Sequence, residues 1–354
     1  MFTPIFRAGY IAIVMIAAAV LFSGCISPKD KIERATLLET VEASEAELVS
    51  QVNNLAKVDS MFARVDLKFE DNSFAELGIA EKYKTADGEI VVQRPASILL
   101  KVKVPIIKTD VAQMASDGTS FQVAVLQDGG SGKYKKFVTG TNSEDYSPLQ
   151  EKVDDLSNGN SEMKRNVNAF ANLRPQHFTE AMLVRPVDES RYTYTISTIL
   201  QEEFDINAKK KSPLRWVLRG YYLFDEYEQE GGRLRIKRRF WFDRVGGVRL
   251  ARQQIFDSKG EIESDIVYGV EGNLTENGNY RLPLQVELTR PKEKYKMRVT
   301  YQTPTKVIIG NQFPVGAFVL ENVWNLELLD LDKELQELNK TGTQPGGSDK
   351  AGKQ

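Results

Sequence analysis

The sequence predicts a mainly β protein, built on a curved antiparallel sheet or half-open β barrel with an amphipathic helix near each end. Two observations carry this prediction. Apolar and charged residues alternate along several long segments, as in strands with one buried and one wet face. Short turns rich in glycine, aspartate and asparagine separate these segments, which is typical of antiparallel neighbours. Many such strands in one chain imply a sheet that curves strongly.

Residues 1–24 are typical of a secretory signal peptide. Arg7 supplies a positive charge, and the apolar run at 10–22 is shorter than the roughly 20 residues that a membrane-spanning helix needs. The run ends in Leu21-Phe22-Ser23-Gly24-Cys25, which resembles the bacterial lipobox. This resemblance implies that Cys25 becomes the first mature residue and carries acyl chains such as palmitate. The alternative is a short membrane anchor with an incidental thiol.

The anchor prediction extends to location. In bacterial lipoproteins, an aspartate directly after the acylated cysteine retains the protein in the inner membrane. This chain has Ile26 at that position, so the resemblance implies anchoring in the outer membrane, facing the periplasm. Residues 25–30 form the predicted tether. Cys25 is the only cysteine, which excludes an intrachain disulfide and a thiolate zinc site. Lys and Arg total 47 against 49 for Asp and Glu, so no nucleic-acid partner is expected.

The predicted β domain spans residues 31–340. Helical spacing of Leu38, Val41, Leu48, Val52 and Leu55 predicts a first helix over 31–58, a candidate lid. Alternation then predicts strands over 61–69, 98–104, 121–125, 234–242 and 295–301. The predicted turns lie at 87–88, 117–118, 128–130, 231–232, 246–247, 259–260 and 277–278.

Two segments interrupt the strand pattern, and a polar tail follows. Residues 146–173 are predicted as a helical or loop insertion. The segment 321–339 is predicted as a second amphipathic helix, with its apolar face formed by Trp324, Leu328, Leu331, Leu335 and Leu338. Residues 341–354 are too polar to fold and are predicted to be disordered.

Several motifs in this order resemble the LolA/LolB-like family of lipoprotein carriers and receptors. They include the run from Gly88 to Pro95, which ends in Arg94-Pro95, and the Ser116-Asp117-Gly118 hairpin. The chain differs from that family in its length and in the insertion. The resemblance implies a half-open antiparallel barrel, capped by helices, around an apolar cavity. It also implies binding of acyl lipids or of the acyl chains of lipoproteins.

The candidate walls of such a cavity are apolar residues on the inward faces of the predicted strands. They are Val65, Leu67, Phe69, Leu100, Val102, Phe121, Val123, Trp216, Leu218, Phe240, Phe242 and Met297. The alternative is that these side chains simply fill a packed core. The protein would then be a structural or envelope-assembly lipoprotein that docks a protein partner, for example by strand addition.

Enzymatic chemistry is not expected. The single histidine, His177, follows Pro175 closely, no Gly-x-Ser-x-Gly elbow is present, and no calcium-loop spacing of carboxylates occurs. The sequence therefore predicts neither a catalytic residue nor a metal or cofactor. The cluster Lys209-Lys210-Lys211 and the cations of the strand from Arg233 to Arg239 are predicted to belong to the wet face of a sheet, with contact to anionic lipid headgroups as the alternative.

Overall fold

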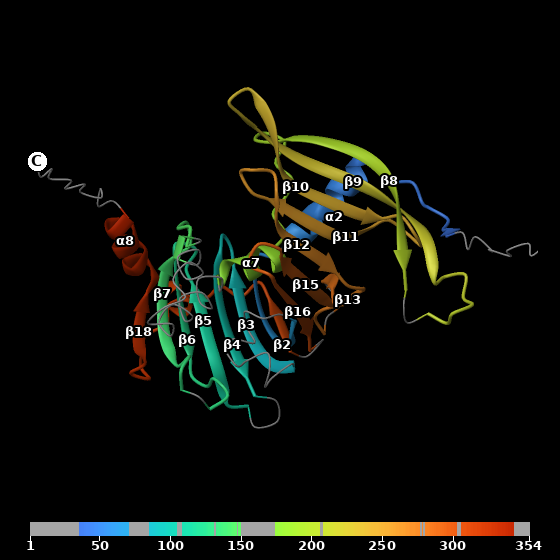
Figure 1. Ribbon diagram of the computed structural model, residues 1–354. Coiled ribbons are helices and arrows are strands. Elements are labelled where there is room, and N and C mark those ends of the chain that lie inside the picture. The colour runs from blue at the N-terminus through green and yellow to red at the C-terminus, as the bar shows by residue number, and fades with distance from the viewer. Residues whose placement is uncertain are drawn as a thin grey trace, which may run out of the picture. The chain divides into compact units, whose positions relative to one another are not determined.

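The computed structural model describes residues 35–70, 85–104, 108–130, 132–146, 148–149, 174–205, 208–276, 278, 280–302 and 306–342 (Figure 1). The chain divides into two compact units. The smaller comprises Met1–Leu37 and Glu202–Leu218, and the larger comprises Leu38–Gln201 and Arg219–Gln354. Cys25, the predicted signal peptide and most of the predicted insertion lie outside the described residues.

The larger unit holds most of the strands. They are β2 (Ser60–Glu70), β3 (Thr85–Gln93), β4 (Ser97–Lys103), β5 (Asp110–Ser116), β6 (Ser120–Val125), β7 (Lys136–Thr141), β10 (Arg233–Asp243), β11 (Arg249–Phe256), β12 (Ile262–Tyr268), β13 (Glu271–Asn273), β14 (Arg281–Pro283), β15 (Gln285–Arg290), β16 (Tyr295–Tyr301), β17 (Val307–Ile309) and β18 (Glu327–Asp330). Its helices are α2 (Glu45–Ala56), α7 (Gln176–Met182), η1 (Val315–Phe318) and α8 (Leu331–Gly342).

The smaller unit contains β1 (Thr36–Leu37), which pairs in parallel with the first residues of β9 (Trp216–Glu230). Strands β8 (Thr193–Phe204) and β9 pair with each other, and both continue into the larger unit. The loop between these two strands belongs to the smaller unit.

The strands join in the order β1-β9-β10-β11-β12-β15-β16-β2-β3-β4-β5-β6-β7-β18, with β8 on β9 and β17 on β2. Every pairing is antiparallel except β1 with β9 and β18 with β7. The two ends of this order do not pair with each other in the described part of the chain, so the sheet stays open. The predicted mainly β class with a curved sheet and few helices is confirmed.

Strand β2 shows why the sheet has an inner and an outer face. Val65, Leu67 and Phe69 are buried, whereas Arg64 and Lys68 between them are exposed. The outer residues form cross-strand ion pairs, such as Arg64 with Glu89 of β3. All five strands predicted from alternation are present within about two residues of their expected bounds.

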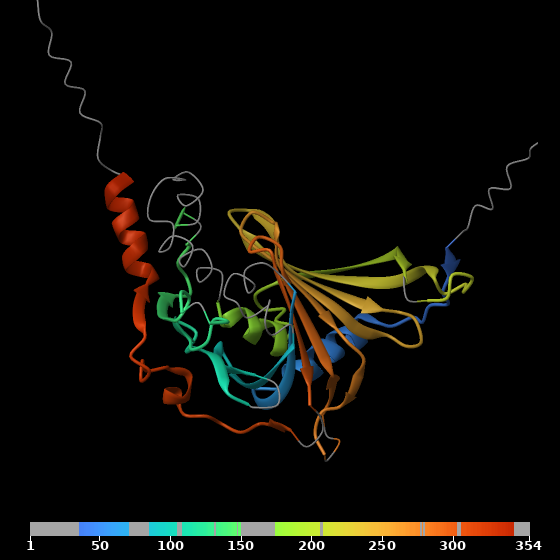
Figure 2. The ribbon, with the colours of Figure 1, turned by 60° about the horizontal axis from the view of Figure 1, so that its bottom comes forward.

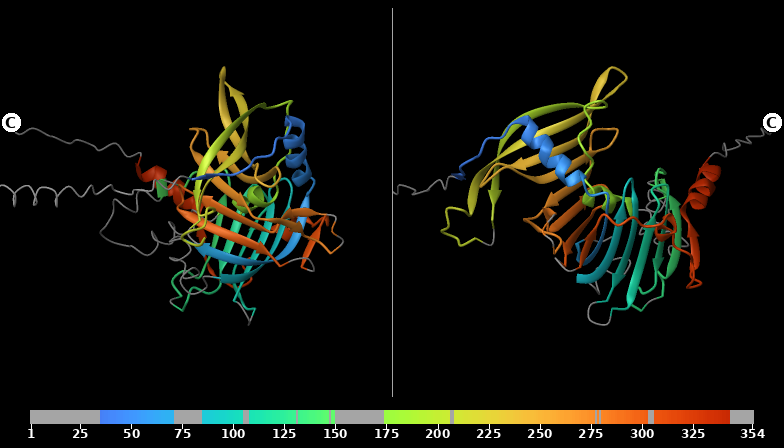
Figure 3. Two further views of the ribbon diagram at one scale, coloured as in Figure 1. Left: turned by 90° about the vertical axis from the view of Figure 1, so that its right-hand side faces the viewer. Right: turned by 180° about the vertical axis from the view of Figure 1, so that it is seen from behind.

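The first predicted helix is too long at its N-terminal end. Residues 38–44 form no regular element, and α2 begins only after Ser44. The Ser44 side chain accepts a hydrogen bond from the Glu47 backbone N–H, while the Glu47 carboxylate accepts one from the Ser44 N–H. This capping box fixes the start of the helix. Leu48 and Val52 then face the core, and α2 lies against β11 (Figure 3).

The second predicted helix, over 321–339, is wrong in its first half. Residues 327–330 form β18, which pairs in parallel with β7 from Glu327 opposite Lys136 to Asp330 opposite Thr139. The helix α8 starts only at Leu331, so Trp324 and Leu328 lie outside it. Pairing with a strand almost 200 residues earlier overrides the helical spacing of the apolar residues.

The predicted turn at Asp87-Gly88 is also wrong, because both residues lie within β3, where Gly88 pairs with Val65 of β2. A Cβ atom at Gly88 would lie only 2.8 Å from Leu67 Cδ1. Glycine here serves close packing rather than chain reversal. The chain turns instead at Arg94-Pro95, after β3 ends.

Candidate functional site

The inner face of the sheet is covered by α7, which contacts β3, β4 and β15 (Figures 1 and 2). This short helix was not predicted as an element. Phe178 and Ala181 point into the core, and Leu183 and Val184 extend the apolar surface just after the helix. Pro175 begins α7, and no side chain caps its N-terminus. Apolar packing, rather than capping, therefore holds this helix in place.

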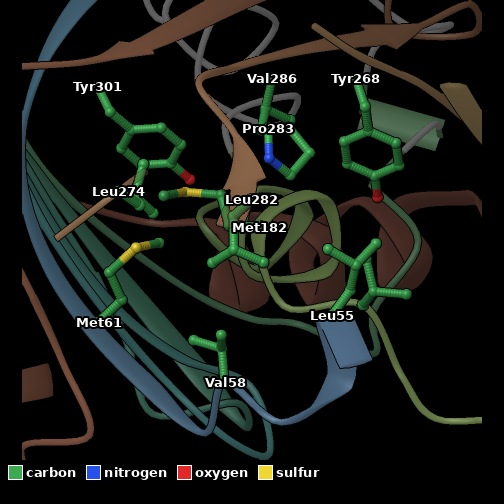
Figure 4. Close-up of a pocket in the computed structure, with 11 residues that line it drawn as sticks. Leu55, Val58, Met61, Met182, Tyr268, Leu274, Leu282, Pro283, Val286 and Tyr301 are labelled. Carbon is green, nitrogen blue, oxygen red and sulfur yellow. The ribbon is translucent and has the colours of Figure 1, made fainter. Parts of the chain in front are cut away.

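An apolar cavity of about 30 Å³ lies between the C-terminal end of α2, the end of α7 and the inner face of the sheet (Figure 4). It is lined by Leu55, Val58, Met61, Met182, Val184, Tyr268, Leu274, Leu282, Pro283, Val286 and Tyr301. No charged side chain lines it. In Figure 4, Met182 lies near the centre, with Tyr301 and Tyr268 of the sheet on either side of it and Leu55 below Tyr268. This volume suits about one water molecule and is far smaller than an acyl chain.

Arg94 connects the elements around this cavity. Its Nη2 donates to the carbonyl oxygen of Ala56, at the end of α2, over 3.2 Å. The same nitrogen donates to the carbonyl oxygen of Val184, just after α7, over 2.7 Å. One guanidinium at the end of β3 thus ties both helices to the sheet, and we refer to it as the Arg94 latch. The sequence analysis quoted Arg94 only as part of a turn motif and missed this role.

His177 lies inside the protein. Its side chain is 2% exposed, and Nδ1 lies 3.0 Å from the hydroxyl oxygen of Tyr295 in β16. Burial, assisted by the charges of Arg290 and Arg174, holds the pKa of His177 well below its ordinary value. Burial likewise raises the pKa of Tyr295. This pair is a neutral hydrogen bond that attaches α7 to the sheet, with no nucleophile in contact among the described residues.

A second, more polar pocket of about 170 Å³ lies on another side of α7. Thr179, Glu180, Arg185 and Gln253 contribute its polar groups. In the described part of the chain, Thr179 Oγ1 and Gln253 Oε1 are buried without a hydrogen-bond partner. The pocket suits a small polar group that can donate hydrogen bonds.

A buried ion pair lies close to this polar pocket. Arg238 Nε donates to Glu226 Oε1 over 2.8 Å, its Nη2 contacts the other carboxylate oxygen, and both side chains are almost fully buried. Arg238 also donates to the carbonyl oxygens of Arg185 and Pro186. The chain that follows α7 is therefore fixed to β9 and β10. A buried ion pair needs such complete hydrogen bonding to offset the free-energy cost of removing both charges from water.

Ten of the predicted wall residues lie in the hydrophobic core of the larger unit: Val65, Leu67, Phe69, Leu100, Val102, Phe121, Val123, Phe240, Phe242 and Met297. They do not line either pocket described above. The remaining two, Trp216 and Leu218, lie in the smaller unit and are partly exposed. Their role as ligand contacts stays a prediction, as does the lipid anchor at Cys25.

Within the described ranges, no three His, Cys, Asp or Glu side chains come together in a way that suits a metal ion. The helices of this same part of the chain are all too short or too polar to cross a membrane.

No protein-family model matches the sequence, and no curated protein matches it. Solved structures do match. A domain named for outer membrane lipoprotein sorting, from Vibrio parahaemolyticus, is 9% identical over 77% of this chain and 94% of its own, with a TM-score of 0.38. A DUF1329 family protein from Desulfovibrio piger is 11% identical over 77% and 95%, with a TM-score of 0.39.

A LolA superfamily protein from Nitrosomonas europaea is also similar. It is 11% identical over 78% of this chain and 99% of its own, with a TM-score of 0.38. These identities describe a distant likeness and by themselves say nothing about function.

Proposed function

We propose that the protein binds an acyl chain, of a lipid or of a lipoprotein, on the inner face of its sheet beneath α2 and α7. The observation that carries this proposal is the apolar cavity closed by the Arg94 latch. An uncharged lining selects hydrocarbon, because an acyl chain loses no hydrogen bond on entering it. A latch made of two hydrogen bonds is a closure that can open and re-form.

The energetics are compatible with opening. Burial of about ten methylenes contributes roughly 8 kcal/mol. Two hydrogen bonds from a charged group contribute about 1.5–3 kcal/mol each. The gain from hydrocarbon therefore exceeds the loss of the latch. In the closed state, α7 occupies the space that an acyl chain would take.

The predicted wall residues would contact the acyl chain once α7 is displaced. Phe178 and Ala181 of α7 share one hydrophobic core with Leu67, Leu100, Phe121 and the other buried wall residues. Displacement of α7 would expose that inner face, and the acyl chain would replace the apolar side chains of the helix. The ten buried positions are therefore proposed walls of the open cavity, whereas the cavity residues around Met182 form its entrance.

We place the protein in the cell envelope, anchored through acylated Cys25 in the outer membrane and facing the periplasm. The lipobox-like sequence and the absence of aspartate at residue 26 support this location. Acyl lipids and lipoproteins are abundant beside such an anchor. A binding role needs no covalent chemistry, which agrees with the use of His177 as a packed, neutral side chain.

Substitution of Met182 by glutamate tests the binding site. Met182 is only partly buried, so the fold is expected to survive, but a carboxylate in an apolar entrance opposes hydrocarbon. We expect binding of a fluorescent fatty acid, measured by titration, to fall at least tenfold. Met182→Leu is the matched control and keeps its affinity. Unchanged binding by folded Met182→Glu would contradict the proposal.

A second candidate function is docking of an envelope protein partner. Strand β8 pairs only with β9, so its other edge is open in the described part of the chain, and most of its side chains are exposed. An open edge of this kind accepts an added strand. The small volume of the closed cavity favours this candidate as well. It replaces the acyl-binding function if the parent protein binds no fatty-acid probe.

A further inference from the structure

Basic and apolar side chains come together in the smaller unit, at the tip of the β8–β9 hairpin. We define the hairpin tip as Phe204 with residues 208–216. Lys209, Lys210 and Lys211 are exposed, and Phe204 and Leu214 are 57% and 60% exposed. Exposed large apolar side chains beside several cations are typical of surfaces that lie at a membrane interface.

The tip is held in shape by its own hydrogen bonds. The backbone N–H of Asp205 donates to the carbonyl oxygen of Arg215 over 2.8 Å, and that of Ser212 donates to Lys209 over 2.8 Å. The Arg215 side chain donates to the carbonyl oxygen of Ala208 and lies 4.8 Å from the Phe204 ring centroid. The loop therefore presents its lysines from a preorganised turn, which lowers the entropic cost of binding.

The lysines of the tip are not interrupted by acidic residues. Residues 208–216 contain three lysines and one arginine but no acidic residue, and the carboxylate closest to them in the sequence is Asp205, beside Phe204. Glu202, farther back along the hairpin, accepts a hydrogen bond from Trp216 Nε1 over 3.3 Å. A concentrated positive turn attracts an anionic surface, at roughly 1 kcal/mol for each basic residue near the membrane, which is about fivefold in affinity.

The tip also lies close to the predicted anchor along the chain. Thr36 and Leu37 of β1 pair with Val217 and Leu218, directly after the tip. Ten residues lie between Cys25 and Thr36, and the eleven Cα-to-Cα steps from one to the other span at most about 40 Å. An acylated Cys25 would therefore keep β1, and the tip beside it, near the membrane surface. A lipid anchor gains most from a second, weak contact of this kind.

We propose that the hairpin tip is a membrane contact for bilayers rich in anionic lipid. The lysines face the headgroups, while Phe204 and Leu214 reach the boundary of the hydrocarbon region. This contact is distinct from the proposed acyl-binding site and does not depend on it. It adds a second attachment in the smaller unit, beside the predicted anchor.

The test uses residues 26–354, which retain every described residue, in sedimentation with vesicles. One vesicle type contains phosphatidylglycerol in phosphatidylcholine, and the other is pure phosphatidylcholine. We expect binding to the anionic vesicles alone, weakening as salt rises. The combined change Lys209→Ala, Lys210→Ala and Lys211→Ala lowers the partition coefficient on the order of 100-fold. Equal binding to both vesicle types would overturn the proposal.

A matched control removes the same charge elsewhere. The exposed residues Lys306, Lys333 and Lys340, all changed to alanine, leave vesicle binding within about twofold of the parent. A loss as large as that of the tip variant would show that net charge, not the tip, drives binding, and would contradict the proposal. Fatty-acid probe binding in solution is unchanged in the tip variant, so failure here is distinguishable from failure of the proposed function.

Discussion

At the scale of single residues, the inner face of the sheet carries polar groups that strand periodicity does not reveal. Arg238 lies on the same side of β10 as Phe240, yet it is 1% exposed because Glu226 and two carbonyl oxygens satisfy it. Strand periodicity alone predicts a wet face for the cations of this strand. Arg239 fits that prediction better, because its side chain is 29% exposed where it pairs with Asp225. Which of these two arginines is buried depends on partners that the sequence does not show.

The buried His177 makes folding stability depend on pH. Its pKa in the folded protein lies below the value of about 6.5 in the unfolded chain, so the unfolded chain binds more protons between these two values. The stability contributed by neutral His177 is fully present above about pH 6.5 and is lost as pH falls below it. We expect the free energy of unfolding to decrease by up to about 1.4 kcal/mol per pH unit there.

Urea denaturation at several pH values checks this expectation. His177→Gln keeps a hydrogen-bonding side chain opposite Tyr295 but cannot titrate, so its unfolding free energy should fall less steeply below pH 6.5. Identical slopes for the parent and His177→Gln would show that the histidine is already protonated in the folded protein. The same variant should bind fatty-acid probe as the parent does.

At the scale of elements, local signals predicted strands well and helix ends poorly. The start of α2 could have been predicted from the sequence, because Ser44 and Glu47 have the spacing of a capping box. The apolar residues before Ser44 also have helical spacing, and they led to a predicted helix that starts too early. By contrast, nothing local marks residues 327–330 as a strand, since β18 exists through its pairing with β7. Helix α7 was likewise unpredicted, because seven residues are too few for a periodic pattern.

The Arg94 latch gives a prediction at this scale. Arg94→Leu removes the bonds to Ala56 and Val184 that exist in the closed arrangement, so the equilibrium shifts toward displaced helices. We expect a lower melting temperature and a fatty-acid affinity that is at least roughly tenfold higher, because the loss of even one of these bonds removes about 1.5–3 kcal/mol from the closed state.

Arg64→Leu is the control for that experiment, because Arg64 lies on the outer face of the neighbouring strand and pairs with Glu89. It should change neither the affinity nor the melting temperature by much, as surface ion pairs contribute little. If Arg94→Leu bound the probe no better than Arg64→Leu, the guanidinium would be a structural brace rather than a latch.

At the scale of the whole molecule, alternation and turns were sufficient for the fold class but not for the order of the strands. Strand β2 is the first long strand in the sequence, yet it lies in the middle of the sheet between β3 and β16. Periodicity identifies the buried face of each strand without naming its neighbours. For the same reason, the apolar residues of the inner face were predictable, whereas their covering by α7 was not.

The predicted anchor is tested on the intact cell. Cys25→Ser removes the acylation site, so we expect the protein to move from the membrane fraction to the soluble fraction of the envelope. Ile26→Asp keeps the cysteine and should remain in the membrane fraction. A Cys25→Ser protein as firmly bound as the parent, even at high salt, would refute the anchor.

The central position of β2 also governs when the protein can become folded. Its partner β16 is made more than 200 residues later, with Lys296 opposite Glu70 and Tyr301 opposite Val65. Until then β2 has an open edge and an uncovered apolar face, a state prone to aggregation. In a chain that emerges N-terminus first, β2 can therefore associate with other copies until β16, near the C-terminus, has emerged. Non-local pairing of this kind makes slow folding a consequence of the strand order itself.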